Sequence, residues 1–332
     1  METKHMIFAA QIYSALTSMT PKCAAEDQIN FANNTLFRKV YETDDYVKGT
    51  ERIRQKIVPG SDNVTFNVNW IYMNQQSTGT LKTVMDNLNT NFWRNNIPIA
   101  FNLSNTAQIP DKNTLDPLDC DSHNSLYEKY GVKSTKVLNI FTGTIVDNAN
   151  AFSKFPAVGN HTDAIFLGDM ENHNLTVTNW SQILTHEVGH WLGLLHTFQG
   201  GCNDKNNDFV NDTPAVNNNP RYQTVVPLEK FSFRNLISGT WNCDTDINTC
   251  PDQPGNDLLD NYMDYTLCQN SFTNGQIFRM MKFAHFRYFP NEKDVSDITQ
   301  TTSTNIPDAK KTSSSITTTQ QTVVAILMFI PI

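Results

Sequence analysis

Hydrophobic and polar residues alternate along the first strongly patterned segment of the chain, residues 64–72. Val64, Phe66, Val68 and Trp70 are separated by single polar residues, which is the period of a β-strand with one buried face. In residues 80–93 the apolar positions instead recur every three or four residues, so this segment predicts an amphipathic helix. These positions are Leu81, Val84, Met85, Leu88 and Phe92. Further apolar runs predict strands at residues 99–103, 136–142 and 164–167.

A second long amphipathic helix is expected directly after the last of these strands. Thr178 or Asn179 offers an N-cap for it. Its apolar residues recur at helical spacing and are Trp180, Ile183, Leu184, Val188 and Trp191. Residues 126–130 predict a short helical turn that Gly131 closes. This order of elements predicts an α/β (α+β) upper subdomain, with a mixed twisted sheet and two long helices, that ends at residue 193.

The chain beyond Gly193 has a different character. Residues 197–260 are rich in Asn, Asp, Pro and Gly and contain no long periodic run. They predict a loop-rich lower subdomain, residues 194–290, that depends on disulfide bonds. Regular structure returns at residues 273–288, where Thr273 as N-cap and Gln276 three residues later predict a closing helix with a capping box.

Both ends of the chain have the composition of processed segments. Residues 1–20 resemble a secretory signal, with an apolar run after Lys4 and His5; the alternative is an ordinary N-terminus. Residues 21–58 predict either a helical pro-segment or the first layer of the catalytic domain, and the catalytic domain itself is expected at residues 59–290. Residues 291–332 form a Ser/Thr-rich tail, and its apolar end at 323–330 is too short to span a bilayer. The tail fits either a GPI-attachment signal or a disordered tail.

Charge and cysteine content narrow the function classes. The formal net charge of the 332 residues is −8, without a basic cluster, which argues against a nucleic-acid partner. Four of the six cysteines lie late in the chain, at Cys202, Cys243, Cys250 and Cys268, which favours an oxidising compartment. Seven N-glycosylation sequons point the same way, at Asn33, Asn63, Asn102, Asn160, Asn174, Asn179 and Asn211.

The second long helix carries the candidate chemistry, because residues 186–196 read H-E-x-x-H-x-x-G-x-x-H. His186 and His190 are four residues apart, so their imidazoles leave one face of a helix and can bind one metal ion. Gly193 can adopt positive φ, which lets the helix end and brings His196 round as a third ligand. Three protein ligands leave one position for water, as in catalytic zinc sites.

Two further residues of this segment bear on catalysis. Glu187 follows the first ligand and can act as the general base on the water, so the segment predicts a zinc endopeptidase. Gly189 should cost about 1 kcal/mol relative to Ala inside a helix, which suggests that room is needed near the metal. The alternative, a surface helix with incidental histidines, does not account for Gly193 and His196. A thermolysin-like protease is the rival among enzymes. It would take its third ligand, a glutamate, from a separate downstream helix, so His196 at this spacing argues against it.

With this signature, the chain resembles the metzincins and, among them, the secreted microbial members of the pappalysin family. A second motif supports the resemblance, Asn261-Tyr262-Met263-Asp264-Tyr265, as do residues 209–214 and 272–280. The resemblance covers about residues 60–290 and implies a metzincin-like fold. It also implies that Met263 is the methionine of the turn beneath the metal, and that Tyr265 ligates zinc or hydrogen-bonds the oxyanion.

The resemblance further implies disulfides, calcium and a route to latency. The disulfide pairs would be Cys202–Cys250 and Cys243–Cys268, whereas the sequence alone allows three pairings. Some relatives bind calcium in this loop region, where Asp208, Asp212 and Thr213 could be ligands; ordinary turn-forming residues are the alternative. Some are kept latent by a pro-segment cysteine on zinc, a role open to Cys23. The rival hypothesis is a Cys23–Cys120 disulfide.

These patterns together predict a secreted or cell-surface-anchored zinc endopeptidase that acts on proteins or peptides. A protein of another class on the same fold is the main alternative, namely a catalytically weak cell-surface binding protein. The intact set of Glu187 and three histidines argues against it, because a degenerate site would normally lack one of them.

Overall fold

The structure, a computed structural model, describes residues 46–74, 78–110, 114–116, 119–146, 150–154, 163–170, 175–203, 208–217, 246–266 and 268–290. The predicted signal, the tail from residue 291, Cys23 and Cys243 lie outside these ranges. Among the residues described, no helix has the length and hydropathy needed to cross a membrane.

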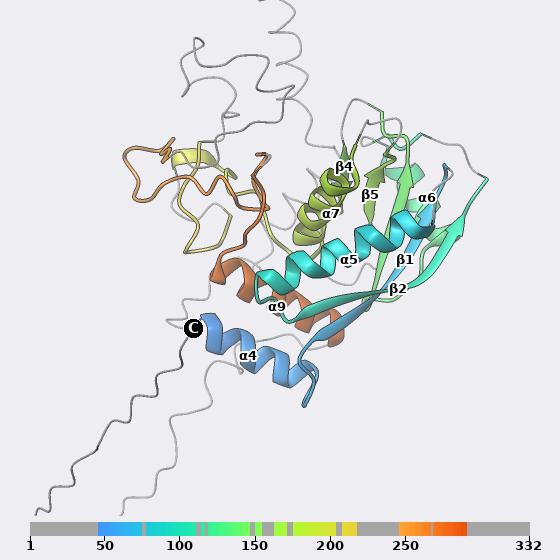
Figure 1. Cartoon of the computed structure of the whole chain (residues 1–332), viewed down its shortest axis with the longest axis horizontal. Helices are drawn as coiled ribbons and strands as arrows, with labels where there is room; N and C mark the ends of the chain where they lie inside the picture. The colour runs from blue at the N-terminus through green and yellow to red at the C-terminus, as the bar shows by residue number, and fades with distance from the viewer. Residues whose placement is uncertain are drawn as a thin grey trace, which may run out of the picture. The chain divides into compact units, whose positions relative to one another are not determined.

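A five-stranded mixed sheet forms the upper subdomain, on the right in Figure 1. Its strands are β1 (Val64–Tyr72), β2 (Ile99–Gln108), β3 (Val137–Gly143), β4 (Ala151–Ser153) and β5 (Ile165–Gly168). Their order in the sheet is β2-β1-β3-β5-β4. Strands β2, β1, β3 and β5 are parallel, whereas β4 pairs antiparallel with β5 and forms one edge of the sheet. The mixed sheet expected from the sequence is therefore confirmed.

The sheet is covered on both faces, which explains why its strands are so apolar. On one face, alternating residues of β1 pack in the main core with α5 (Thr78–Arg94) and α7 (Val177–Trp191), and Figure 1 shows α5 in front of the sheet. On the other face, Phe141 and Phe166 pack with Leu126 and Tyr127 of α6 (Cys120–Tyr130). The alternation predicted for residues 64–72 is confirmed, because Val64, Phe66, Val68 and Trp70 are all fully buried.

Several predicted boundaries were wrong. Strand β2 is longer than residues 99–103, and β4 was not predicted. Helix α6 begins at Cys120 rather than near Leu126, because Asp119 caps a polar first turn by accepting from Ser122 N. Helix α7 is capped by Thr176, whose Oγ1 accepts from Asn179 N at 3.1 Å, and not by Thr178 or Asn179.

The lower half is built mostly of turns, as its composition predicts. Cys202 and Cys250 form a disulfide bond, which is one of the two pairs that the resemblance implies. Cys268 is also disulfide-bonded. The closing helix α9 (Asn274–Tyr288) begins with the predicted capping box, since Thr273 Oγ1 accepts from Gln276 N and Gln276 Oε1 accepts from Thr273 N.

Helix α4 (Tyr46–Ile57) packs lengthwise against α9 (Figure 1). Ile53 and Ile57 are buried in the main core. A Cβ atom on Gly49 would lie 2.5 Å from the Phe278 ring, so the two helices are in close contact there. Both alternatives for residues 21–58 allow this packing, so the boundary between a pro-segment and the catalytic domain stays a prediction.

Candidate active site

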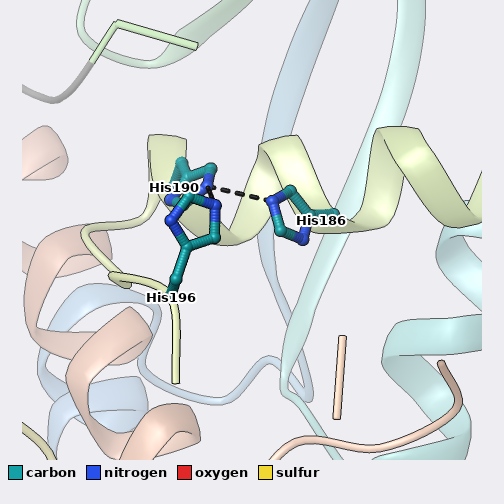
Figure 2. A group of neighbouring side chains, drawn as sticks. All are labelled: His186, His190 and His196. Atoms are coloured by element: carbon teal, nitrogen blue, oxygen red, sulfur yellow. Dashed lines mark hydrogen bonds between the residues drawn. The ribbon is translucent and has the colours of Figure 1, made fainter. Parts of the chain in front are cut away.

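His186 and His190 lie one turn apart on α7, and their side chains point to the same side of the helix (Figure 2). Their Nε2 atoms are 3.0 Å apart. Both side chains are almost completely buried, with exposures of 6% and 5%. The helix packs on the sheet through Trp180, Leu184 and Val188, so the face that carries the two imidazoles is fixed by the hydrophobic core.

His196 reaches the same point because the chain turns sharply at Gly193. Gly193 has φ +83°, and a Cβ atom on it would lie 2.2 Å from the Phe283 ring. Arg279 of α9 donates from Nε to Gly193 O at 2.7 Å and holds the turn in place. The turn directs His196 back towards α7, with its Nε2 3.1 Å from that of His190 (Figure 2).

Backbone carbonyls orient two of the three imidazoles. His186 Nδ1 lies 2.6 Å from Tyr262 O and His190 Nδ1 lies 2.8 Å from Leu194 O. A carbonyl oxygen can only accept, so both Nδ1 atoms carry the proton and both Nε2 atoms present a bare lone pair. Burial lowers the pKa of His186 to about 4 and that of His190 to about 3, and the nearby His186 adds to the second shift. The imidazoles are therefore neutral at physiological pH.

This arrangement fits a bound cation. Two bare lone pairs 3.0 Å apart cannot hydrogen-bond to each other and repel unless a positive ion lies between them. Tetrahedral zinc with Zn–N bonds of about 2.0–2.1 Å would require nitrogen atoms roughly 3.3 Å apart, close to the spacing found. His186, His190 and His196 form the one group of potential metal ligands found in the described part of the chain.

The segment 261–265 lies against the site, because Tyr262 O contacts His186 and the Tyr265 ring contacts both His186 and His196. Met263 is fully buried, and a Cβ atom on Gly189 would lie 2.5 Å from Met263 Sδ. The room that the sequence suggests near Gly189 is thus occupied by Met263. Two contacts fix the turn: Thr197 Oγ1 donates to Asp264 Oδ2 at 3.0 Å, and the amides of Asn261 and Gln276 hydrogen-bond to each other reciprocally.

Glu187 lies on the side of α7 that faces strand β4. Its side chain is buried, and Oε2 accepts a hydrogen bond from Ser153 Oγ. Burial raises the pKa of Glu187 to about 7, and the Ser153 hydrogen bond opposes this rise. A carboxyl group with this pKa can take up and release a proton near neutral pH.

Two aromatic rings flank His196. The Phe198 ring is nearly parallel to the His196 ring, with 4.7 Å between centroids and 8° between planes. The Tyr265 ring meets His196 at a centroid distance of 4.7 Å and lies 5.0 Å from Phe198. Tyr265 is 54% exposed although it touches buried imidazoles, so it lies where the site opens to solvent.

The three residues named for calcium already bind protein groups. Asp208 accepts from Thr213 Oγ1 at 2.7 Å and from Val210 N at 3.0 Å. Asp212 accepts from Thr273 Oγ1 and Gly275 N, at the N-terminus of α9. These bonds fit the alternative of turn-forming residues, and calcium binding stays a prediction.

Sequence reasoning missed three features of the site. Ser153 lies in a strand of three residues, which is too short for a periodic signal. The carbonyls of Tyr262 and Leu194 have no signature in side-chain identity. Phe198 follows the motif by two residues but has no partner in sequence that would reveal its stacking.

Comparison with known proteins places the chain among metalloproteases. A profile of the family described as pregnancy-associated plasma protein-A matches residues 121–285, from α6 to α9. An extracellular metalloprotease of Verticillium alfalfae is 30% identical over 219 residues, which are 63% of this chain and 69% of that protein. One of Neurospora crassa is 41% identical over 118 residues, which are 35% of this chain but only 32% of that protein.

Among solved structures, mature mirolysin of Tannerella forsythia in complex with a cleaved peptide aligns with a TM-score of 0.48 and 21% identity. The alignment covers 66% of this chain and 91% of that one. The mixed sheet, the two long helices and the disulfide-bonded lower half agree with the metzincin-like fold that the sequence predicts. From the family profile and the match to the Verticillium protein, the chain belongs to the pregnancy-associated plasma protein-A, or pappalysin, family of zinc-dependent metalloproteases.

Proposed function

We propose that this protein is a secreted zinc endopeptidase that hydrolyses peptide bonds of extracellular proteins. The observation that carries the proposal is the convergence of three buried, neutral imidazoles, two of which present bare nitrogen lone pairs to each other. His186, His190 and His196 are the proposed ligands. Zinc, when bound, supplies a Lewis acid that polarises a water molecule and the scissile carbonyl.

Glu187 is the proposed general base. One of its carboxylate oxygens takes a proton from the attacking water, and the same proton then passes to the nitrogen of the leaving amine. The carboxylate is therefore ionised again at the end of each turnover, and no covalent bond to the protein forms. The pKa of about 7, which burial produces, suits a group that must both accept and release the proton.

Tyr265 is proposed to stabilise the transition state. Its phenolic O–H can donate a hydrogen bond to the carbonyl oxygen of the substrate as that oxygen gains negative charge. The support for this role is its position, because its ring contacts His196 and is half exposed at the open side of the site. Met263 is proposed to hold the imidazoles from below through its contact with α7 at Gly189.

Secretion and processing belong to the same proposal. The relatives above are named extracellular metalloproteases, and the disulfide between Cys202 and Cys250 is stable in an oxidising compartment. The proposed order along the chain is a signal, a pro-segment, the catalytic domain and a tail that carries either a GPI signal or no anchor. The proposed catalytic domain is residues 59–290. Latency through Cys23, glycosylation of the sequons and calcium bound by Asp208, Asp212 and Thr213 complete the proposal.

The test uses the purified full chain with a denatured protein mixture as substrate. We expect cleavage, about one zinc ion per chain by elemental analysis, and loss of cleavage on removal of zinc by a chelator. Glu187→Gln keeps the ligands and the shape of the side chain but cannot accept the proton, so it should retain zinc and lose turnover by roughly 10²-fold or more. Zinc-independent cleavage, or a fully active Glu187→Gln protein, would contradict the proposal.

A further inference from the structure

The short strand β4 brings one polar side chain onto the candidate active site. Ser153 pairs with Ile165 of β5 at the antiparallel edge of the sheet. Successive residues of a strand point to opposite faces, so Phe152 packs against Phe166 and His123 on one side while Ser153 faces α7 on the other. The register of a three-residue strand thus determines that a hydroxyl group, and not an aromatic ring, meets the helix.

Ser153 Oγ donates to Glu187 Oε2, and both residues are almost completely buried, with exposures of 4% and 6%. The same hydroxyl oxygen lies 3.1 Å from the backbone oxygen of Glu187, so Ser153 contacts the main chain of α7 as well as the carboxylate. Within the described part of the chain, Ser153 is the one hydrogen-bond donor recorded for this carboxylate.

A carboxylate with a single donor is oriented by that donor. A buried carboxyl group without a partner would pay a desolvation cost of several kcal/mol and would change its rotamer to find one. With Oε2 held by Ser153, rotation about the last side-chain bond is restricted, and the second oxygen is left for the substrate water. Catalytic groups must be held to within about 0.5 Å to be effective, which here requires a second group to fix the carboxylate.

We infer that Ser153 is a positioning residue for peptide hydrolysis, which holds Glu187 through Oε2 so that its other carboxylate oxygen faces the attacking water. The inference rests on the proposed function, because it assigns Ser153 a role only through Glu187. It adds a residue outside the helix motif and the methionine turn, supplied by the edge strand of the sheet.

Ser153→Ala tests the inference in the full-length protein. The variant keeps the strand but leaves Glu187 without its donor. We expect kcat to fall roughly 10- to 100-fold with KM within twofold of the wild type, since a misplacement of about 1 Å can cost 10²-fold in rate. Zinc content should equal that of the wild type. A kcat within twofold of the wild type would overturn the inference.

Two other substitutions separate the hydrogen bond from packing. Ser153→Cys nearly preserves the volume but offers only a weak donor, whereas Ser153→Thr adds a methyl group and keeps the hydroxyl. A role in hydrogen bonding predicts higher kcat for Thr than for Cys; the reverse order would show that packing governs and would overturn the inference. These two variants also decide the question if Ser153→Ala does not fold.

Ser181→Ala is the matched control, because Ser181 is a buried serine of α7 that donates to Val177 O and accepts from Asn87 Nδ2, away from Glu187. It should lose stability comparable to Ser153→Ala while its kcat stays near the wild-type value. Glu187→Gln distinguishes a failure of the proposed function from a failure of the inference about Ser153. An active Glu187→Gln protein would remove the proposed base and the inference together, whereas an inactive one beside a fully active Ser153→Ala would remove the inference alone.

Discussion

At the scale of single residues, backbone carbonyl groups orient two of the three imidazoles. His186 and His190 each donate Nδ1–H to a backbone carbonyl, that of Tyr262 in one case and that of Leu194 in the other. Both carbonyls belong to turns, one beside Met263 and one directly after Gly193. Substitutions that displace these turns should therefore disturb the candidate metal site more than substitutions that only change the Tyr262 or Leu194 side chain.

Gly189→Ala should weaken metal binding although Ala is the better helix former. A Cβ atom would lie 2.5 Å from Met263 Sδ, and Met263 is fully buried, so the sulfur must move or the helix must shift. We expect the gain of about 1 kcal/mol in helix propensity to be outweighed by an overpacking cost of about 1–3 kcal/mol. Zinc affinity should fall about tenfold or more, measured by competition with a chromophoric chelator, with stability measured by urea unfolding.

The control for this substitution is the double variant with Met263→Leu. Leucine lacks the extended thioether, so it should relieve the contact and make Gly189→Ala less costly in stability than it is in the wild-type background. Additive effects of Gly189→Ala and Met263→Leu would show that the two side chains do not compete for the same space.

How far the sequence predicts the candidate site depends on the type of contact. The spacing of the motif along the sequence identifies His186, Glu187, His190 and His196, because all four lie within one helix and the turn that follows it. The serine that touches Glu187 comes from 34 residues earlier along the chain, on a strand with no periodic signal. No local pattern could join the two, since the pairing of β4 with β5 decides which side chain faces α7.

At the scale of secondary-structure elements, length determines what the sequence predicts. The strand β1 and the helices α5, α7 and α9 each bury a repeating apolar set, so their patterns were sufficient. The start of α6 is polar and depends on Asp119 as a cap, and the apolar periodicity began too late to reveal it. The turn-rich lower half follows hydrogen bonds between side chains and backbone, such as those of Asp208, which period-based reasoning does not capture.

The turn at residues 208–213 should make stability depend on pH. Burial raises the pKa of Asp208 from its ordinary value of 3.8 to about 7, against the opposing effects of Thr213, Val210 N and Arg279. Below pH 3.8 both the folded and the unfolded state hold the proton. As pH rises towards 7, the unfolded state releases it first, so the folded state loses relative stability by at most about 4 kcal/mol, and the loss is constant at higher pH.

Comparison with Asp208→Asn measures this effect, because Asn does not titrate. The difference in unfolding free energy, wild type minus variant, should decrease between pH 4 and pH 7 and level off above, in urea titrations with EDTA present. Calcium at this site would reverse the trend, since a bound cation lowers the pKa of its carboxylate ligand. A difference that does not vary with pH would contradict the raised pKa.

At the scale of the whole described molecule, a buried ion pair connects the C-terminal end of α9 to the upper subdomain. Arg287 forms a buried ion pair with Asp163, which lies just before β5. Its Nη2 also donates to Trp191 O at 2.6 Å, and its guanidinium lies 3.4 Å from the centre of the Trp191 ring. Helix α9 also carries Arg279, which bonds to Gly193, and Gln276, which bonds to Asn261. The ion pair therefore connects the sheet to the helix that holds both turns of the candidate site.

Removing one partner of this ion pair should be costly. The side chains are only 5% and 9% exposed, so Asp163→Asn leaves a buried guanidinium without its counter-charge. We expect a loss of about 3–5 kcal/mol in unfolding free energy, whereas the double variant with Arg287→Met should lose less than the sum of the two single changes. Asp86→Asn provides the control, because the Lys82–Asp86 pair is 73% and 61% exposed and should change stability by no more than about 0.5 kcal/mol. If Asp163→Asn lost no more stability than Asp86→Asn, the Arg287–Asp163 pair would be exposed to water in solution and would not stabilise the packing of α9 against the sheet.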